Sequence, residues 1–302
     1  MGEQAHHISV CICTYRRPQL LRRLLDSLRD QETDGLFTYS ITVADNDSLR
    51  SAETVVSEFA GCSQIPVRYC VEPQRSISAT RNKAIENASG DFIALIDDDE
   101  FTTKDWLRTL FEAASKDGVA GVLGPVNSHF DVAPPEWVLK GNFYRHSVAP
   151  TGSVLEWQKG RTGNVLFKKG ILTRGEMPFS TQFRGGSGDQ DFFRRMIEKG
   201  NRFIWCEEAV AYEVVPPVRW KRSFMLKRAL LRGGTTLLHP TFGVSDILKS
   251  LIAVPAYALA LPFSLVLGHH RLMRIMISLC DHTGKLLACL GIRPIKVTYV
   301  TE

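Results

Sequence analysis

The stretch that decides the fold is Phe92-Ile93-Ala94-Leu95-Ile96-Asp97-Asp98-Asp99-Glu100. Its five apolar residues run directly into four acids, and Gly90 stands just ahead of them. A short apolar run that begins after a turn residue is typical of a strand buried inside a parallel sheet. The acids then mark the point where this strand reaches the edge of the sheet.

Strand-like and helix-like segments alternate on both sides of this stretch. The hydrophobic pattern predicts strands at 8–14, 39–44, 67–71, 92–96 and 119–122, and helices at 18–28, 52–59, 76–88 and 106–114. Such alternation predicts an α/β fold in which helices cover both faces of a mostly parallel sheet. Ligands of such sheets bind at the carboxyl ends of the strands.

The composition fits a soluble globular protein. The chain has 302 residues, of which 44% are hydrophobic and 23% charged, and this excludes disordered, collagen-like and disulfide-scaffold classes. Seven cysteines, an odd number with no CxxC pair, favour reduced thiols in a cytoplasm, and we expect Cys11 and Cys13 to be small core residues. The first residues show no secretion signal.

The C-terminal part has a different character. Residues 216–302 contain 12 Lys/Arg and 3 Asp/Glu, whereas residues 1–215 contain 25 and 29. Eighteen uncharged residues, Ser250 to Leu267, interrupted by Pro255 and Pro262, lie within this basic part. We expect an α/β domain over 1–218 and a helical tail over 219–302.

The tail has two interpretations. Its cations, Arg219, Lys221, Arg222, Lys227, Arg228 and Arg232, could draw an amphipathic helix to anionic headgroups, and 250–267 could then form an interfacial or re-entrant hairpin with 272–290. The alternative is a soluble helical appendage packed on the sheet domain. Because the cations stand beside the apolar run, membrane attachment is favoured.

Polar clusters follow three of the predicted strands. The first strand ends at Thr14-Tyr15-Arg16, the second at Asp45-Asn46-Asp47, and the fourth at the acids 97–100. Neither GxGxxG nor GxxxxGK[ST] is present, so the glycine loops that cradle phosphate in dinucleotide and P-loop sites are missing. A divalent cation would relieve repulsion among the acids, although a solvated acidic turn is the alternative.

Several motifs in the right order resemble the inverting nucleotide-sugar glycosyltransferases of family 2, over about residues 7–215. They are Ile8–Arg17, Val43–Ser48, Ser78–Asn82 and Asp97–Asp99. The resemblance implies the Rossmann-like fold called GT-A. It also implies Asp99 as a metal ligand and a nucleotide- and sugar-binding set made of Thr14, Tyr15, Arg16, Asp45, Asp47, Arg81, Asp97 and Asp98.

Three later segments extend the resemblance. Arg161–Phe167 resembles the floor of the donor and acceptor site, and this implies that Asn164 binds the donor, although Asn164 could instead form a turn. Gly185–Phe192 resembles the catalytic segment, with Asp189 as the base and Gly188 where the family commonly has Glu. Glu213 stands where many members have a metal-binding His, as in members similar to succinoglycan-type exopolysaccharide glucosyltransferases.

Two of these assignments have structural alternatives. Asp189 could be the N-cap of a helix, and Arg81 could pair with Glu86. The chemistry supports the implied roles independently, because a leaving diphosphate needs a cation such as Mg²⁺ or Mn²⁺ and the attacking hydroxyl needs a base.

The implied function is transfer of a hexose, with inversion, from a nucleotide sugar, which we expect to be UDP-linked, to a free or lipid-linked saccharide acceptor in surface polysaccharide synthesis. We expect a cytoplasmic enzyme, peripheral on the inner face of the cell membrane, with an anionic membrane surface but no nucleic acid as a partner. The alternatives are a sugar-1-phosphate nucleotidyltransferase and a catalytically silent membrane scaffold.

Overall fold

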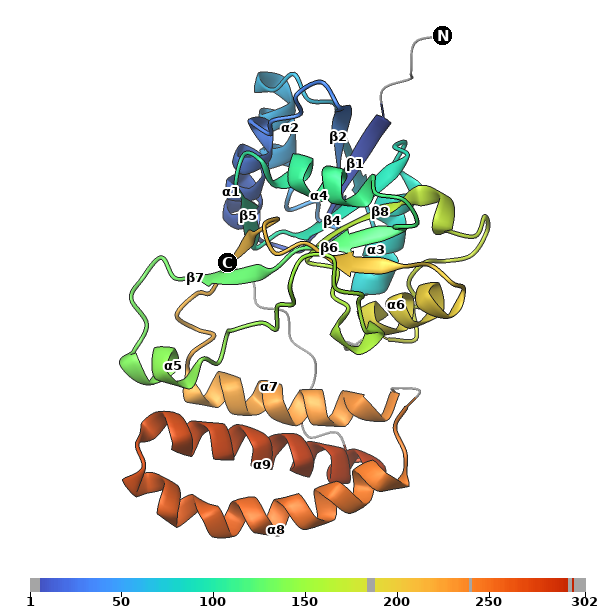
Figure 1. Ribbon diagram of the computed structural model, residues 1–302. Coiled ribbons are helices and arrows are strands. Elements are labelled where there is room, and N and C mark those ends of the chain that lie inside the picture. Colours follow the sequence, from blue (N-terminus) through green and yellow to red (C-terminus); the bar gives the residue numbers. More distant parts are fainter. Residues whose placement is uncertain (1–5, 184–187, 239–240, 293–294, 296–302) are drawn as a thin grey trace.

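A computed structural model describes residues 6–183, 188–238, 241–292 and 295 (Figure 1). Residues 185–187 of the predicted catalytic segment lie outside the described residues. The main sheet has seven strands in the order β3-β2-β1-β4-β8-β6-β9. Their bounds are β1 (His6–Thr14), β2 (Phe37–Asp45), β3 (Val67–Val71), β4 (Phe92–Asp97), β6 (Gly121–Leu123), β8 (Asn164–Lys168) and β9 (Phe203–Trp205).

The sheet is mostly parallel, as predicted. β1 pairs in parallel with β2 and β4, β2 with β3, and β6 with β9, whereas β8 runs antiparallel to both β4 and β6. In this arrangement the residues after β1, β2 and β4 meet at one edge of the sheet. The predicted α/β fold class is therefore confirmed.

Helices cover both faces of the sheet because side chains alternate between the faces along each strand. Ile8, Val10 and Ile12 of β1 pack with apolar residues of α1 (Pro18–Arg29), α2 (Glu53–Cys62) and α4 (Trp106–Ala114). On the other face, Cys11 packs in a core formed with α3 (Ile77–Glu86) and α6 (Gly188–Glu198). Cys11 and Cys13 are both buried, as expected for small core residues.

A second sheet extends the edge where the polar residues gather. It contains β5 (Glu100–Thr102), β10 (Ala211–Val214) and β7 (Val126–His129), with β10 in the middle. β5 and β10 are antiparallel, and Glu213 is the register partner of Glu100. This pairing brings Glu213 to the acids that follow β4. The short helices are α5 (Glu136–Gly141) and the 3₁₀ turns Trp157–Lys159, Lys169–Ile171 and Thr236–Leu238.

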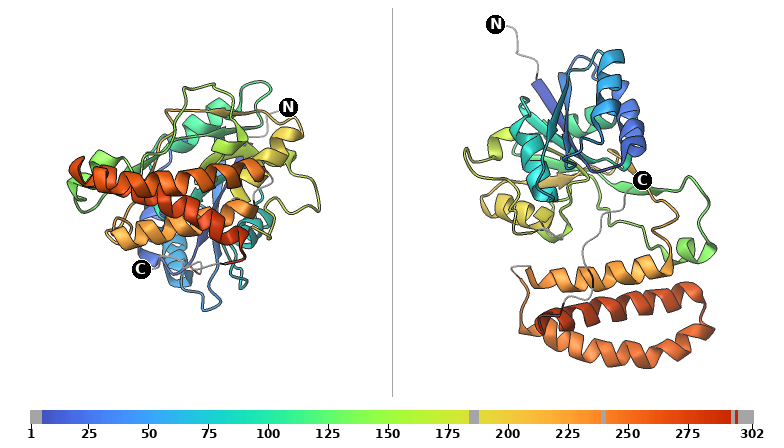
Figure 2. Two further views of the ribbon diagram at one scale, coloured as in Figure 1. Left: turned by 90° about the horizontal axis from the view of Figure 1, so that it is seen from below. Right: turned by 180° about the vertical axis from the view of Figure 1, so that it is seen from behind.

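The tail is a layer of three helices, α7 (Arg222–Thr235), α8 (Val244–Val266) and α9 (His269–Cys289). α7 faces the sheet domain, α9 lies behind it and α8 is outermost (Figures 1 and 2). Two glycines show how closely α7 and α9 approach. A Cβ at Gly233 would lie 2.0 Å from the Asp281 carbonyl oxygen, and a Cβ at Gly284 would lie 2.3 Å from the Leu230 carbonyl oxygen. These glycines allow the two backbones to touch.

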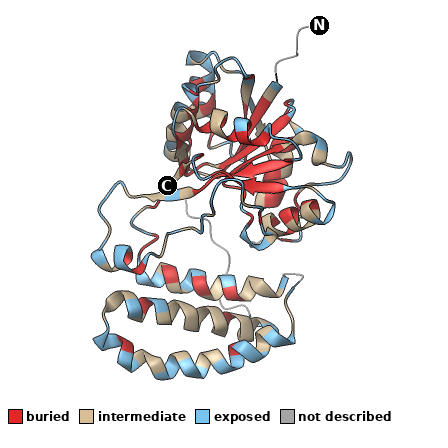
Figure 3. Ribbon diagram, viewed as in Figure 1, coloured by how far each residue is buried: buried red, intermediate tan, exposed pale blue. Residues whose placement is uncertain are grey.

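The structure revises the predicted details of the tail. α8 is one continuous helix that includes both Pro255 and Pro262, so the prolines do not break it into a re-entrant segment, and it forms a hairpin with α9. It is the one described helix that is long and apolar enough to cross a membrane, and most of its surface is exposed (Figure 3). The basic stripe is also divided: Arg219 is buried, and Arg228 faces a cavity against the sheet domain. Lys227 and Arg232 also line the cavities, so four of the six predicted cations lie toward the sheet domain.

Candidate active site

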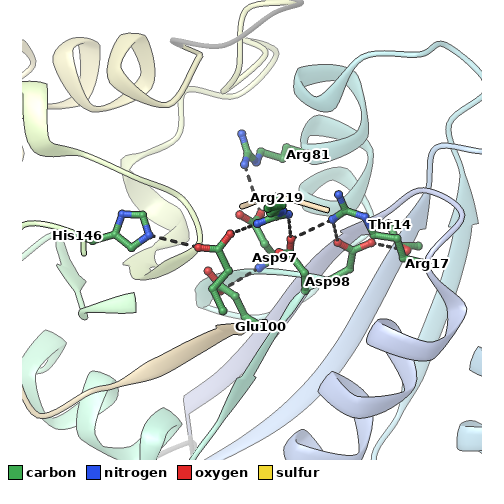
Figure 4. A network of polar contacts seen from close by, with 10 residues as sticks. Thr14, Arg17, Arg81, Asp97, Asp98, Glu100, His146 and Arg219 are labelled. Atoms are coloured by element: carbon green, nitrogen blue, oxygen red, sulfur yellow. Dashed lines mark hydrogen bonds and ion pairs between the residues drawn. The ribbon is translucent and has the colours of Figure 1, made fainter. Parts of the chain in front are cut away.

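The predicted acids after β4 lie in one network of acids and arginines at the edge of the sheet (Figure 4). Arg17 Nη1, at the start of α1, lies 2.8 Å from Asp98 Oδ1 and 3.2 Å from Asp99 Oδ2. The Thr14 hydroxyl, at the end of β1, donates to Asp98 Oδ2 at 2.8 Å. The neighbouring strands β1 and β4 thus bring Thr14 and Asp98 together across 84 residues of sequence.

Arg219 joins the two predicted metal ligands. Its Nη2 lies 2.5 Å from Asp99 Oδ2, its Nη1 contacts Glu213 Oε1, and only 8% of the residue is exposed. His146 Nε2 lies 3.3 Å from the other oxygen of Glu213. The sequence argument assigned relief of the acid cluster to a metal ion, whereas in the structure arginines supply the opposing charge.

Arg81 bridges the acid cluster and the predicted base. Its guanidinium lies 2.6 Å from Asp189 Oδ1 and 3.5 Å from Asp97 Oδ1. Arg81 comes from α3, and Asp189 is the second residue of α6, so two helices on the same face of the sheet deliver this pair. The alternative partner of Arg81 was wrong, because Glu86 pairs with Lys83 at 3.0 Å.

The acid cluster is strongly affected by burial. Burial raises the pKa of Asp97 to about 6 against the opposing charge of Arg81, and it raises the pKa of Asp98 to about 7 against that of Arg17. Burial also raises the pKa of Glu100, whose Oε2 accepts a hydrogen bond from the Asp97 amide at 3.2 Å. Burial acts to raise the pKa of Glu213 too, but the hydrogen bond to His146 and the charge of Arg219 outweigh it and lower that pKa to about 2.

The residues predicted to bind the nucleotide lie along the same edge, beyond Thr14. Arg16 has a positive φ of 52° and holds Asp47 with two contacts of 2.8 and 3.3 Å. The Tyr15 hydroxyl lies 2.5 Å from Arg75 Nη2. A small cavity of about 60 Å³ opens beside Thr14 and Tyr15.

Asp45, which was predicted to bind the nucleotide, has hydrogen-bond partners inside the protein. This residue is fully buried, and its carboxylate accepts hydrogen bonds from the amides of Asp47 and Ala52 and from the Tyr69 hydroxyl, all within 2.9 Å. Its acceptor groups are therefore used to shape the turn after β2. Asp45 thus positions Asp47.

Asn164, which was predicted to bind the donor, also has its hydrogen-bond partners inside the protein. Its Oδ1 accepts from Trp106 Nε1 at 2.9 Å, and its Nδ2 donates to the carbonyl oxygens of Pro125 at 2.9 Å and Ala209 at 2.7 Å. Only 2% of the residue is exposed. The amide ties α4 and two loops to β8, a structural role inside the domain.

Two cavities lie between this edge of the sheet and α7. One of about 570 Å³ is lined by Asp189, Glu100, His146 and, from the tail, Arg232. The other, of about 430 Å³, is lined by Arg17, Arg81 and the acids 97–99. The edge of the sheet therefore faces two adjoining spaces with the predicted base in one and most of the acid cluster in the other.

Sequence reasoning missed four residues of this network, Arg17, Glu100, His146 and Arg219. Arg17 follows directly after the predicted Arg16, and Glu100 completes the quoted acidic run, so both had a local signal. His146 had none. Arg219 stands in a basic run that resembles a membrane-binding stripe, and only the pairing of β10 with β5 brings it to the acids.

Comparison with known proteins identifies the family. Residues 9–184 match the sequence profile described as glycosyl transferase family 2. The succinoglycan biosynthesis protein ExoM of Rhizobium meliloti (strain 1021) is 34% identical over 236 residues, which cover 78% of this chain and 75% of that protein.

The chain belongs to glycosyl transferase family 2. The resemblance seen in the sequence is thereby confirmed, and the protein is a glycosyltransferase. Solved structures of such enzymes share its fold. The mannosyltransferase PcManGT from Pyrobaculum calidifontis, in complex with GDP-Man and Mn²⁺, has a TM-score of 0.67 at 17% identity and covers 95% of this chain and 88% of its own. S. aureus TarS 1-349, in complex with UDP, has a TM-score of 0.55 at 14% identity and covers 97% and 94%.

The donor set at Asp99 and Glu213 fits a hard cation such as Mg²⁺ or Mn²⁺. Among the described residues, no three His, Cys, Asp or Glu side chains are grouped to hold a metal ion by themselves. Mg²⁺ sites commonly use one or two carboxylates together with oxygens of a substrate phosphate. Asp99 and Glu213 supply such a pair of carboxylates, already arranged around one positive group, the guanidinium of Arg219.

Proposed function

We propose that this glycosyltransferase transfers a hexose from a UDP-sugar, with inversion at the anomeric carbon, to a saccharide acceptor carried on a membrane lipid. The product would belong to a surface polysaccharide, as the name of the succinoglycan relative suggests. UDP is favoured because the TarS structure of the same fold holds this nucleotide. The proposed location is the cytoplasmic side of the cell membrane.

The single observation that carries the proposal is the position of Asp189. Its carboxylate is fixed by Arg81 at 2.6 Å and lines the larger cavity, and the same arginine reaches back to Asp97. A base in this position lies next to the acid cluster and is separated from it by the Arg81 guanidinium. Inversion requires such an arrangement, because the attacking hydroxyl approaches the anomeric carbon on the face opposite the leaving group.

The proposed roles follow from this geometry. Asp189 accepts the proton of the acceptor hydroxyl as its oxygen attacks the anomeric carbon. Arg81 orients the carboxylate, and Asp97 and Asp98 remain the proposed contacts of the sugar and ribose. Tyr15, Arg16 and Asp47 lie beyond Thr14 along the same edge, where the nucleotide would extend.

Mg²⁺ or Mn²⁺ would be held by Asp99 and Glu213. When bound, the ion would neutralise charge on the leaving diphosphate. Since Arg219 contacts both carboxylates, binding at this pair requires its guanidinium to move away. The protein therefore holds an internal cation where the proposed metal would bind.

The outer face of the tail supports a membrane-borne acceptor. On α8, Ile252 is 72% exposed, Leu259 and Phe263 are each 74% exposed, and Val266 is 89% exposed. A contiguous apolar face of this kind is typical of a helix that lies in a membrane interface. The face lies on the side of the tail away from the sheet domain (Figures 1 and 3). On the other side of the tail, residues of α7 line both cavities. A lipid-linked acceptor would thus enter between the membrane and the edge of the sheet.

A screen of nucleotide sugars tests this function. We expect release of UDP from one UDP-sugar, stimulated by Mn²⁺ or Mg²⁺, and loss of the stimulation in Asp99→Asn but not in Asp26→Asn, an exposed carboxylate on α1. Release of GDP alone would contradict the choice of UDP. No release from any nucleotide sugar would favour the silent scaffold, and the family assignment already disfavours the nucleotidyltransferase.

A further inference from the structure

The two cavities beside the sheet edge share some of their lining residues. Asp97 and Glu213 line both cavities from the sheet domain, and Phe224 and Arg228 of α7 line both from the tail. The smaller cavity also contains Arg17 and Lys227, so its walls carry several positive groups around the acids. Arg228 therefore lies where the two cavities adjoin.

Arg228 differs from the other arginines around this centre. Arg17, Arg81 and Arg219 each contact at least one carboxylate. Within the described part of the chain, no hydrogen bond or ion pair is found for the side chain of Arg228. Of the acids that line the smaller cavity with Arg228, all four (Asp97, Asp98, Asp99 and Glu213) already contact another arginine.

The surroundings of Arg228 disfavour an isolated positive charge. Arg228 is exposed toward the cavities that it lines, and desolvation by the surrounding protein first and the charge of Arg219 second lower its pKa. A guanidinium that faces a cavity without a carboxylate partner, beside a second positive group, is stabilised when an anion binds to it. An anion of the substrate is the natural partner for it.

We infer that Arg228 is a catalytic residue, supplied by the tail, that binds the diphosphate of the nucleotide-sugar donor. This inference rests on the function proposed above. In the reaction, the bond between the anomeric carbon and the diphosphate oxygen breaks and its electron pair goes to that oxygen. The acceptor oxygen forms the new bond, and its proton goes to Asp189. Arg228 would stabilise the negative charge that the departing diphosphate gains.

The phosphate of a lipid-linked acceptor has the same chemistry, and Arg228 faces that space as well. The donor is favoured because Arg228 lines the smaller cavity together with Arg17 and Asp99. Those residues belong to the network proposed to hold the metal and the donor. The larger cavity, by contrast, has arginines of its own, Arg145 and Arg161, and Arg161 contacts the His146 ring.

The tail is held in place so that Arg228 can act. Near the C-terminal end of α7, Arg232 Nε pairs with Asp281 of α9 at 2.8 Å. α9 contacts the sheet domain through Arg274 Nη2, which donates to the Gly141 carbonyl oxygen at 3.0 Å. Its His269 ring lies 4.5 Å from that of Trp137. The tail would therefore form part of the catalytic unit in addition to anchoring the protein at the membrane.

Binding of UDP and UMP to the full chain tests the inference. With Mn²⁺ present, calorimetry should show that Arg228→Gln weakens UDP binding by about tenfold or more while UMP binding changes little. UDP carries the second phosphate, so it loses a hydrogen bond to a charged group in the variant, whereas UMP has no second phosphate to lose it. Arg228→Lys keeps the charge and should recover part of the preference for UDP. Arg222→Gln removes the same charge at the exposed start of α7, outside both cavities, and should match the parent.

The outcomes separate this inference from the proposed function. If the parent binds no UDP, the proposed function fails and the inference fails with it. If the parent prefers UDP and Arg228→Gln keeps the same preference, the inference alone is overturned. Phosphatidylcholine vesicles with and without farnesyl diphosphate test the acceptor source: if Arg228→Gln loses diphosphate-dependent vesicle binding but keeps the UDP preference, Arg228 binds the acceptor.

Discussion

Replacement of Arg219 by Gln should make the protein bind Mn²⁺ more tightly in the absence of nucleotide. In the parent, one guanidinium contacts both Asp99 and Glu213, so an ion that uses both carboxylates must first displace it. A hydrogen bond to a charged group contributes about 1.5–3 kcal/mol, and the loss of one such contact without recovery corresponds to about tenfold to a hundredfold in affinity. We expect Arg219→Gln to gain affinity within this range.

Mn²⁺ titration followed by electron paramagnetic resonance measures free ion directly and needs no substrate. Arg222→Gln removes an equal charge from the start of α7 and controls for a general change of electrostatic potential. The double variant Arg219→Gln with Asp99→Asn should lose the gain. Unchanged Mn²⁺ affinity in Arg219→Gln, or an equal gain in Arg222→Gln, would show that Arg219 does not occupy the metal position.

Three further predictions concern the tail and Asn164. Gly233→Ala should destabilise the protein by about 1–3 kcal/mol through overpacking against α9, whereas Gly234→Ala, whose new Cβ would have no contact nearer than 3.9 Å, should not; urea unfolding distinguishes them. Asn164→Ala should lower the free energy of unfolding by about 2–4 kcal/mol through its three lost hydrogen bonds, and unchanged urea stability would contradict its structural role. Phe263→Glu should reduce flotation with anionic liposomes, whereas Met177→Glu on the sheet domain should not; equal flotation of both would leave α8 without a membrane role.

The sequence predicted the fold and the edge at which the polar residues meet because both follow from hydrophobic periodicity and from the geometry of parallel strands. Thr14 and Asp98 meet there because Thr14 ends β1, Asp98 directly follows β4, and the two strands are neighbours. The resemblance to the family placed Asp189 near them. The fold and the position of this edge could be predicted because they depend on local patterns that recur along the chain.

The sequence could not show which polar residues the protein itself uses. Asp45 and Asn164 stand in the predicted motifs, yet backbone amides and carbonyls consume their hydrogen-bonding groups. Arg219 and Arg228 read as cations of a membrane-binding helix, because nothing in their spacing reveals that α7 faces the sheet domain. Such assignments depend on how distant segments pack, and that information is not local.

Sugar transfer by Asp189→Asn tests the central claim most directly. Asn keeps the size of the side chain and can still accept the hydrogen bond from Arg81, so the variant should fold and retain metal-dependent UDP affinity. It cannot take a proton, and loss of a general base typically lowers the rate by about 10² to 10⁴. Asp191→Asn is the control, because that carboxylate is held by Arg194 and Arg195 within α6. We predict that Asp189→Asn binds UDP like the parent and transfers sugar at least about a hundredfold more slowly. Transfer near the parent rate in Asp189→Asn, with Asp191→Asn inactive, would contradict the assignment of the base.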